Sequence, residues 1–238
     1  MHGFDRTAIR LAGLISILAA LSGIAGDLAL QYTSNTQHLM SRQSLYLLDV
    51  SPGRLLLGHY LGVVAILVEI AGFWAVYRAL RPAGERYALP FFLMNAFGAM
   101  LGAAFHATFV FVGLTLQAQA RVTGTQYSEF AELLASFNTA RIGLALPALA
   151  AIMLGSLLYA FTVGFKPTLY PRWMAFCNPL AFLLLIVAFT LTVPRSALVL
   201  APTAINVSHL LFFIGSTIAM WSGSSASNRR PFVPRIVA

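Results

Sequence analysis

The chain has 238 residues, of which 59% are hydrophobic and only 9% charged, and its mean hydropathy is +0.80. A soluble domain usually carries about 25% charged residues, so this composition excludes an ordinary soluble protein. The net charge of +8 does not indicate a nucleic-acid partner, because the arginines stand singly or in pairs beside hydrophobic segments, as topology determinants do. The single cysteine, Cys177, excludes an internal disulfide and a multi-cysteine metal site.

Long apolar runs alternate with short polar segments along the chain, which is the pattern of a bundle of membrane-spanning helices. Each run has about the 20 residues that are needed to cross ~30 Å of hydrocarbon. The third run is longer, so we expect it to tilt or to project from the bilayer. The sequence therefore predicts one all-α domain over residues 1–238, an integral membrane bundle of six transmembrane helices. The predicted spans are Leu11–Leu30, Leu55–Tyr77, Leu89–Leu116, Ile142–Gly164, Trp173–Val193 and Leu200–Trp221.

The arginines and lysines that flank these spans predict the orientation. With the N-terminus inside, ten of them fall on the cytoplasmic side and five on the outer side, so the positive-inside rule places both termini in the cytoplasm. We expect a multi-pass protein of the cell membrane. The inner ten are Arg6, Arg10, Arg78, Arg81, Arg86, Lys166, Arg172, Arg229, Arg230 and Arg235, and the outer five are Arg42, Arg54, Arg121, Arg141 and Arg195.

The polar connections also allow predictions. Within the outer loop Gln117–Arg141, the segment Ser128–Phe137 is predicted as a short surface helix, with Ser128 as its N-cap and two glutamates in its first turns. The alternative is a plain connector. The basic tail Ser222–Ala238 is expected to lie along the cytoplasmic surface.

Five titratable side chains fall inside predicted spans: Asp27, His59, Glu69, His106 and His209. On insertion scales each charge there costs about 2.5–3.5 kcal/mol, so each requires an explanation. At a rise of 1.5 Å per residue, Asp27 and His59 lie roughly 5–6 Å below the outer surface, and His106 and His209 roughly 14–15 Å. Glu69 is deepest, at roughly 21 Å. His106 and His209 therefore share a level near the midplane.

Helical spacing predicts where these side chains point. His106 follows Gly98 and Gly102 at four-residue steps, and such a small-residue face packs against other helices. His59 and Glu69 lie on one broad face of the second span, so His59 is one candidate partner for Glu69. We expect these faces to converge on an interior cavity that opens outward.

Two groups of candidate site residues follow from this cavity. Asn206 and Phe213 share a face with His209, and aromatic residues such as Trp74 could line a pocket for an apolar molecule. The alternative is that His106 and His209 are each a structural hydrogen-bond partner and that the Asp27 side chain extends to the membrane–water interface. The candidate catalytic residues are Asp27, Glu69, His106 and His209, and the candidate substrate-binding residues are His59, Trp74, Asn206, Phe213 and Arg172.

A second polar cluster is predicted at the cytoplasmic face, around the start of the fifth span. It includes Lys166, Tyr170, Arg172 and Trp173. This combination is typical of an aromatic belt with basic anchors. The functional alternative is a contact of Arg172 and Lys166 with a lipid headgroup or a phosphate.

Short motifs resemble a family of uncharacterised bacterial multi-pass membrane proteins. They are Gly26-Asp27, Gly72-Phe73-Trp74 with Tyr77, Phe105-His106-Ala107 and Tyr170-Pro171-Arg172-Trp173. The resemblance covers most of the chain and implies a multi-pass topology in the bacterial inner membrane but no activity.

A second resemblance is local. The stretch Phe105-His106-Ala107-Thr108-Phe109 resembles the Phe-His-x-Thr-Leu segment of alkaline ceramidases and related membrane metal hydrolases, which implies a zinc ligand at His106. The pattern of that family places a serine and an aspartate where this chain has Gly102 and Gln117, and it has paired late histidines where this chain has only His209.

The leading hypothesis from the sequence is a membrane-embedded enzyme that acts on a lipid or isoprenoid-like substrate. In one mechanism His106, His209 and Asp27 hold a divalent metal such as zinc, with Glu69 as the alternative carboxylate, and the open position activates water for hydrolysis. In the other, a carboxyl group and a histidine transfer protons without a metal, as an isomerase or cyclase requires.

Two other classes stay open. A proton-coupled transporter or small-molecule binder would use Glu69 and His59 as a relay. Against it, the sequence shows no repeat, and Pro147 and Pro179 are the only candidate helix breaks well inside a span. A structural or partner-binding membrane protein would need the polar residues only to pair with one another.

Overall fold

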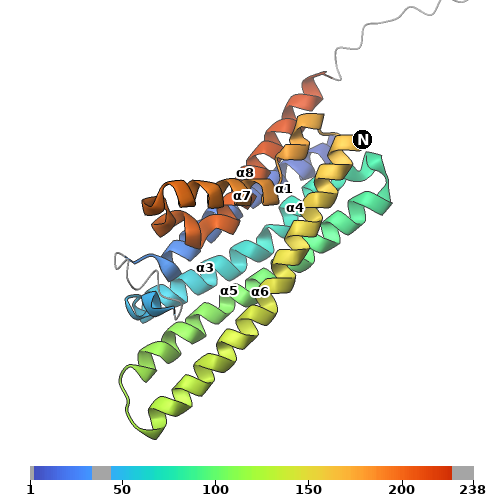
Figure 1. Ribbon diagram of the computed structural model, residues 1–238. Helices are drawn as coiled ribbons and strands as arrows, with labels where there is room; N and C mark the ends of the chain where they lie inside the picture. The colour runs from blue at the N-terminus through green and yellow to red at the C-terminus, as the bar shows by residue number, and fades with distance from the viewer. Residues whose placement is uncertain (1–2, 34–43, 227–238) are drawn as a thin grey trace, which may run out of the picture.

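A computed structural model describes residues 3–33 and 44–226, with side chains described for residues 7–33 and 44–221. This part of the chain is helical and contains no strand, so the all-α prediction is confirmed (Figure 1). The α-helices are α1 (Gly3–Gln31), α3 (Pro52–Val68), α4 (Ile70–Leu80), α5 (Glu85–Gln119), α6 (Thr125–Phe165), α7 (Pro179–Thr192) and α8 (Ala197–Ala226). Four short 3-10 turns join them: η1 (Leu45–Leu48), η2 (Arg81–Ala83), η3 (Arg172–Phe176) and η4 (Pro194–Ser196).

Five helical segments of the described chain are long and apolar enough to cross a membrane, which supports the prediction of a multi-pass membrane protein. They are Thr7–Gln31, Pro52–Ala83, Glu85–Gln119, Thr125–Phe165 and Pro194–Trp221. The predicted span Trp173–Val193 is divided into η3 and α7, and α7 has only 14 residues, or about 21 Å. A count of six crossings and the orientation of the termini stay predictions.

The first residues of α7 are held by hydrogen bonds inside the bundle. Asn178 is the N-cap: its side chain accepts a hydrogen bond from the backbone N–H of Ala181 and donates one to the carbonyl of Ala175. The hydroxyl of Ser156, on α6, accepts from the backbone N–H of Leu180 at 3.2 Å. Proline at the first helical position needs no donor partner, so Pro179 starts a helix here.

The outer loop predicted at residues 117–141 is largely helical, and the separate surface helix Ser128–Phe137 is therefore wrong. Helix α6 begins at Thr125 and continues for 41 residues, about 61 Å, and Ser128 lies inside it rather than at its N-cap. Its partner α5 has 35 residues. The hairpin of α5 and α6 extends past the other helices at one end of the molecule (Figure 1), as expected of helices longer than a bilayer is thick.

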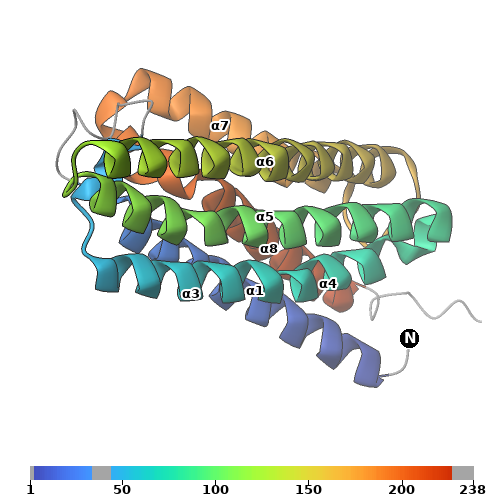
Figure 2. The same cartoon turned by 90° about the horizontal axis from the view of Figure 1, so that it is seen from below.

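Helix α1 packs against α3, α4 and α8, while α5 packs against α3, α4 and α6, and α7 lies along α8 (Figure 2). Glycines let α1 and α3 approach closely: a Cβ built at Gly58 would lie 2.7 Å from the carbonyl oxygen of Gly26, and one at Gly26 would lie 2.8 Å from the Gly62 nitrogen. On α5, Gly98 faces α6, where a Cβ would meet Ile152 at 3.2 Å. This contact agrees with the predicted small-residue packing face.

The second span is broken at Glu69, the one buried residue that separates α3 from α4. The backbone N–H of Glu69 still donates to Ala65, but Gly72 and Phe73 both donate to the Glu69 carbonyl and thereby start a new helix. The sequence did not indicate this break, because no proline or glycine marks it. The candidate break at Pro147 is absent, because α6 continues through that residue.

The first residues of α1 and the last residues of α8 lie at the same end of the bundle (Figures 1 and 2). This is the arrangement that an even number of crossings produces. Several basic residues used to predict the orientation lie outside the described residues or have undescribed side chains, as does the greater part of the basic tail Ser222–Ala238. They are Arg6, Arg42, Arg229, Arg230 and Arg235.

Candidate functional site

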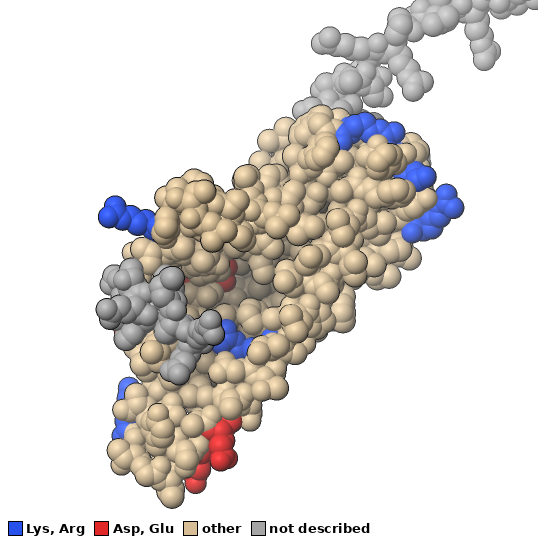
Figure 3. Space-filling model, in the orientation of Figure 1, with Lys and Arg blue, Asp and Glu red and all other residues tan. Residues whose placement is uncertain are grey.

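A cavity of about 330 Å³ lies in the interior of the bundle, between α8 on one side and α5 and α6 on the other. Small and aliphatic side chains form most of its wall, and polar side chains from α1, α5 and α8 and from the α3–α4 junction form one part of it. Figure 3 shows a hollow on this face of the molecule, with acidic atoms on its wall and basic atoms at its lower edge. The polar residues that line the cavity are Asp27, Gln31, Glu69, His106, Asn206 and His209.

The first polar group joins α1, α3, α5 and α8. The Nδ1 atom of His106 lies 3.4 Å from Oδ1 of Asp27, and its Nε2 atom lies 3.1 Å from the carbonyl oxygen of Gly58. The amide of Asn206 donates to Oδ2 of Asp27 at 2.6 Å. All three side chains are buried, so these contacts occur away from water.

These contacts restrict the protons of the His106–Asp27 pair. A carbonyl oxygen can only accept, so His106 Nε2 must carry a hydrogen and donate it to Gly58. The Nδ1 atom then faces a carboxylate oxygen, and the contact is favourable only when one proton lies between them. The pair therefore shares one proton, and both ring nitrogens of His106 are occupied by protein groups.

The second polar group joins the α3–α4 junction to α8. Nδ1 of His209 lies 2.6 Å from Oε2 of Glu69, and the Glu69 side chain is fully buried. The rings of Phe73 and Phe213 lie beside the imidazole, with centroids 5.4 and 6.0 Å away. The aromatic rings hold the imidazole in place, and the break between α3 and α4 sets the position of Glu69.

Two atoms of this second pair have no hydrogen-bond partner within the described chain: Oε1 of Glu69 and Nε2 of His209. A buried polar atom without a partner costs about 1–3 kcal/mol, so it requires an explanation. Both residues line the cavity. The carboxyl oxygen and the imidazole nitrogen are thus unused hydrogen-bonding groups, buried within residues that line the cavity.

The structure brings together Asp27, Glu69, His106, Asn206 and His209, which the sequence analysis had proposed for one site. Of the possible partners for Glu69, the structure shows His209 and not the candidate His59. The step of ten residues from His59 to Glu69 leaves the two side chains about 80° apart around an ideal helix, and His59 packs instead on Tyr60 and Phe111.

The other proposed substrate-binding residues lie away from the cavity. Trp74 is half-buried and stacks with the guanidinium of Arg78, 5.6 Å from the ring centroid. Phe213 is buried in the aromatic core and contacts the site only through His209. Arg172 donates to the carbonyls of Val163 and Lys166, so it holds the end of α6 and the loop that follows.

The side chains proposed as metal ligands are divided between the two pairs. Within the described residues, no three His, Cys, Asp or Glu side chains converge as a metal ion would require. His106 donates its Nε2 hydrogen to a carbonyl, which leaves only Nδ1, 3.4 Å from Asp27, as a ligand atom from this histidine. The donor set therefore does not fit the predicted zinc site.

Sequence reasoning missed two contributors to this site. The carbonyl of Gly58 fixes the orientation of His106, and the absence of a side chain at Gly62 leaves room for the ring, which a Cβ there would overlap. The Gly58-x-x-x-Gly62 spacing in the second span was the available signal. Arg141 was assigned to the outer loop, but it stacks on two phenylalanines of the cavity wall, Phe105 and Phe109.

Comparison with known proteins identifies the family of the chain. No curated protein and no solved structure matches it. The family of unknown function DUF6796 matches residues 4–223, nearly the whole chain, including every helix that contributes to the cavity. The chain therefore belongs to this family, which agrees with the predicted resemblance to an uncharacterised family.

Proposed function

We propose that this protein is a membrane-embedded enzyme of the bacterial inner membrane that acts on a lipid or isoprenoid-like substrate. The observation that supports this most is the His209–Glu69 pair at a largely apolar cavity, in which one imidazole nitrogen and one carboxyl oxygen have no hydrogen-bond partner among the described residues. A structural pair would use its hydrogen-bonding atoms on the protein, as the His106–Asp27 pair does with Nε2.

The surroundings of the cavity favour an apolar substrate that arrives from the bilayer. Its walls include Ala148, Leu149 and Ile152 from α6 and Ala204 and Ile205 from α8. Leu149 is 37% and Ile205 43% exposed, so the two sides of the cavity reach the surface of the bundle that lipid would cover. At about 330 Å³, the cavity lies at the lower end of the range for small-molecule sites, about 300–1,000 Å³.

The chemistry that fits best is proton transfer by the His209–Glu69 pair. His209 Nε2 takes a proton from an allylic carbon of the substrate, and Glu69 stabilises the imidazolium through Nδ1. The same nitrogen then returns a proton to the far carbon of the allyl system, so that a double bond moves and no external reagent is consumed. In this proposal His106 and Asp27 are positioning residues that hold α1, α3, α5 and α8 around the cavity.

The topology belongs to the same proposal. Six crossings with both termini in the cytoplasm agree with the excess of basic residues on the inner segments and with the shared end of α1 and α8. The sixth crossing would be made by η3 and α7 together.

Deuterium incorporation tests the proposed chemistry. The purified protein in lipid nanodiscs is incubated with an extract of bacterial membrane lipids in D₂O, and the lipids are compared by mass spectrometry. We expect at least one lipid to gain deuterium or to isomerise with the wild-type protein and not with Glu69→Gln. Unchanged lipids with a folded wild-type protein would contradict the proposal.

A proton-coupled transporter is the second candidate, and the helix break at Glu69 specifically favours it. Broken helices with a buried titratable group are typical of transport sites. Proton-driven uptake into liposomes that Glu69→Gln abolishes, together with unaltered lipids in D₂O, would select this alternative.

A further inference from the structure

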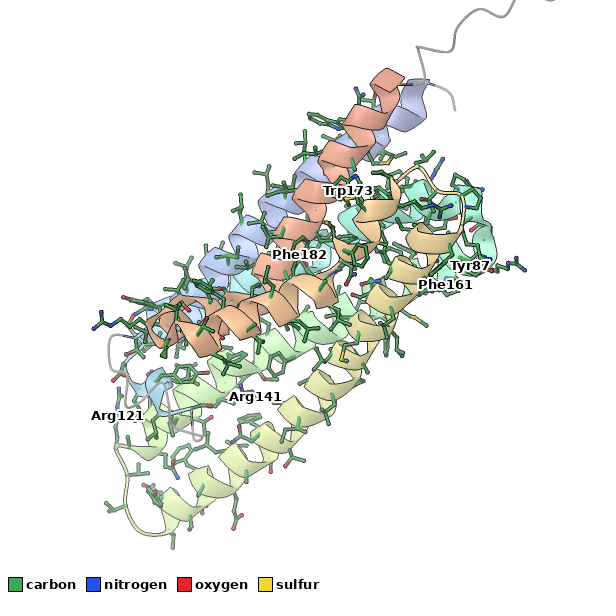
Figure 4. All side chains as sticks on the ribbon, turned by 45° about the horizontal axis from the view of Figure 1, so that its top comes forward. Tyr87, Arg121, Arg141, Phe161, Trp173 and Phe182 are labelled. Carbon is green, nitrogen blue, oxygen red and sulfur yellow. The ribbon has the colours of Figure 1, made fainter. Side chains whose placement is uncertain are left out.

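Arg141 is a cationic group beside the outer end of the cavity. It lies on α6, and its guanidinium carbon is 4.3 Å from the ring centroid of Phe109 and 5.5 Å from that of Phe105. Both rings line the cavity. Figure 4 shows Arg141 in the space between α5 and α6, inside the bundle rather than on its outer surface.

No carboxylate of the described residues forms an ion pair with Arg141. Its Nε is buried and has no hydrogen-bond partner there, and Nη1 makes only a long contact, 3.4 Å, with Asn138 Oδ1. The Tyr46 hydroxyl is within hydrogen-bonding reach. Burial raises the pKa of that phenol, although the nearby guanidinium acts in the opposite direction, so Tyr46 is neutral at pH 7 and does not balance the charge.

The level of Arg141 is suited to a headgroup. It precedes the end of α6 at Phe165 by 24 residues, which is about 36 Å along the helix axis and slightly more than the ~30 Å of hydrocarbon. Helix α6 ends at the end of the bundle that holds the beginning of α1 and the end of α8 (Figure 1). Arg141 is therefore near the opposite interface, where lipid phosphates lie, while the catalytic pair is deeper.

We infer that the cavity binds an anionic amphiphile, a molecule with one phosphate-like headgroup at Arg141 and an apolar chain that extends along the cavity toward His209 and Glu69. A planar guanidinium binds such a headgroup through two parallel hydrogen bonds. The inference rests on the proposed function, because it names the substrate class of the same site. The inference concerns binding alone, however, so it can be tested without turnover.

Calorimetric titration with defined probes provides the test. Full-length protein in nanodiscs of zwitterionic phosphatidylcholine is titrated with octyl phosphate, with 1-octanol and with inorganic phosphate. The variants are Arg141→Gln, Arg141→Lys and the matched control Arg121→Gln, which removes an exposed arginine at the α5–α6 turn (Figure 4). Gly102→Leu fills the cavity from a position where a Cβ makes only ordinary contact with Ile66, at 3.8 Å.

We expect wild-type protein and Arg121→Gln to bind octyl phosphate more tightly than octanol, and not to bind inorganic phosphate measurably. Arg141→Gln should lose about tenfold in affinity for octyl phosphate, which corresponds to about 1.4 kcal/mol, and none for octanol. Arg141→Lys should keep part of the preference, because lysine keeps the positive charge but not the planar guanidinium. Gly102→Leu should weaken the binding of both octyl phosphate and octanol.

Equal affinity of wild-type protein and Arg141→Gln for octyl phosphate would overturn the inference, and Arg141→Lys decides if the glutamine variant does not fold. Binding of inorganic phosphate as tight as that of octyl phosphate would also overturn it, in favour of a free anion site. If octyl phosphate binds as expected but no lipid is altered in D₂O, the inference stands and the proposed enzyme fails.

Discussion

The two histidine–carboxylate pairs of this protein are alike in composition but different in their surroundings. His106 and Asp27 have partners on two further helices besides their own contact: Gly58 on α3 occupies the remaining imidazole nitrogen and Asn206 on α8 the second carboxylate oxygen. His209 and Glu69 are in closer contact with each other, yet each keeps one free atom at the cavity. The comparison teaches that a buried titratable pair indicates function only when some of its hydrogen-bonding capacity is unused.

The largest difference is expected from matched amide substitutions. Glu69→Gln keeps an acceptor for His209 but cannot stabilise the imidazolium, so we expect the lipid-modifying activity to fall by about 10²–10⁴-fold. Asp27→Asn can still accept from Asn206 and donate to His106, so its activity should stay near the wild-type value. The rate of deuterium incorporation in the two variants measures the difference, and equal losses would remove the distinction between the pairs.

Complete removal of Asp27 should affect stability instead. Asp27→Ala leaves the proton of His106 and the amide of Asn206 without a partner in a buried site, and breaking such a pair costs about 3–5 kcal/mol. We expect a clearly lower thermal unfolding midpoint in nanodiscs than for Asp27→Asn, which serves as the control. An unchanged midpoint would show that the pair does not hold the helices together.

The room around His106 can be tested from the opposite helix. A Cβ at Gly62 would overlap the imidazole ring, so Gly62→Ala must displace α3 or His106, and overpacking of this kind costs about 1–3 kcal/mol. Gly53→Ala is the matched control, because a Cβ there meets nothing within 4 Å. Unfolding followed by circular dichroism compares them, and equal stability would mean that α3 is less tightly packed against His106 of α5 than described.

The smallest effect is expected far from the cavity. The hydroxyl of Tyr170 lies 2.5 Å from that of Ser216, and burial raises the pKa of the phenol well above its usual range, so this group acts only as a neutral hydrogen-bonding partner. Tyr170→Phe should cost about 1 kcal/mol of stability and leave both activity and octyl phosphate binding unchanged. A loss of activity at full stability would extend the site toward this end of the bundle.

Much of the fold follows from hydropathy, because apolar runs of sufficient length report helices directly. The errors occur where polar residues continue a helix or where a helix breaks without proline. Helix α6 extends from Thr125 through the charged segment that precedes Arg141, and hydropathy does not distinguish such an extension from a loop. The break at Glu69 has no local signal, because no proline or glycine marks it in the sequence.

For the site, depth and helical face predicted which residues meet but not which of them pair. His106 and His209 both line the cavity, yet their partners are set by contacts between helices that are distant in the sequence. The pairing of Asp27 with Asn206 joins residues 179 positions apart, and no spacing rule reports such a contact. The residue types of Trp74 and Phe213 likewise could not predict that these side chains lie away from the cavity, because aromatic residues pack in the core as readily as they line a pocket.

Chemical modification of the histidines tests the difference between the two pairs most directly. Diethyl pyrocarbonate acylates a free imidazole nitrogen and is small and apolar enough to enter the cavity, and peptide mass spectrometry reports the modified residue. We predict that His209 is modified through its free Nε2 much faster than His106, whose two nitrogens are engaged by Gly58 and Asp27. Modification of His106 at the same rate as His209, or faster, would contradict the assignment of His209 and Glu69 as the reactive pair.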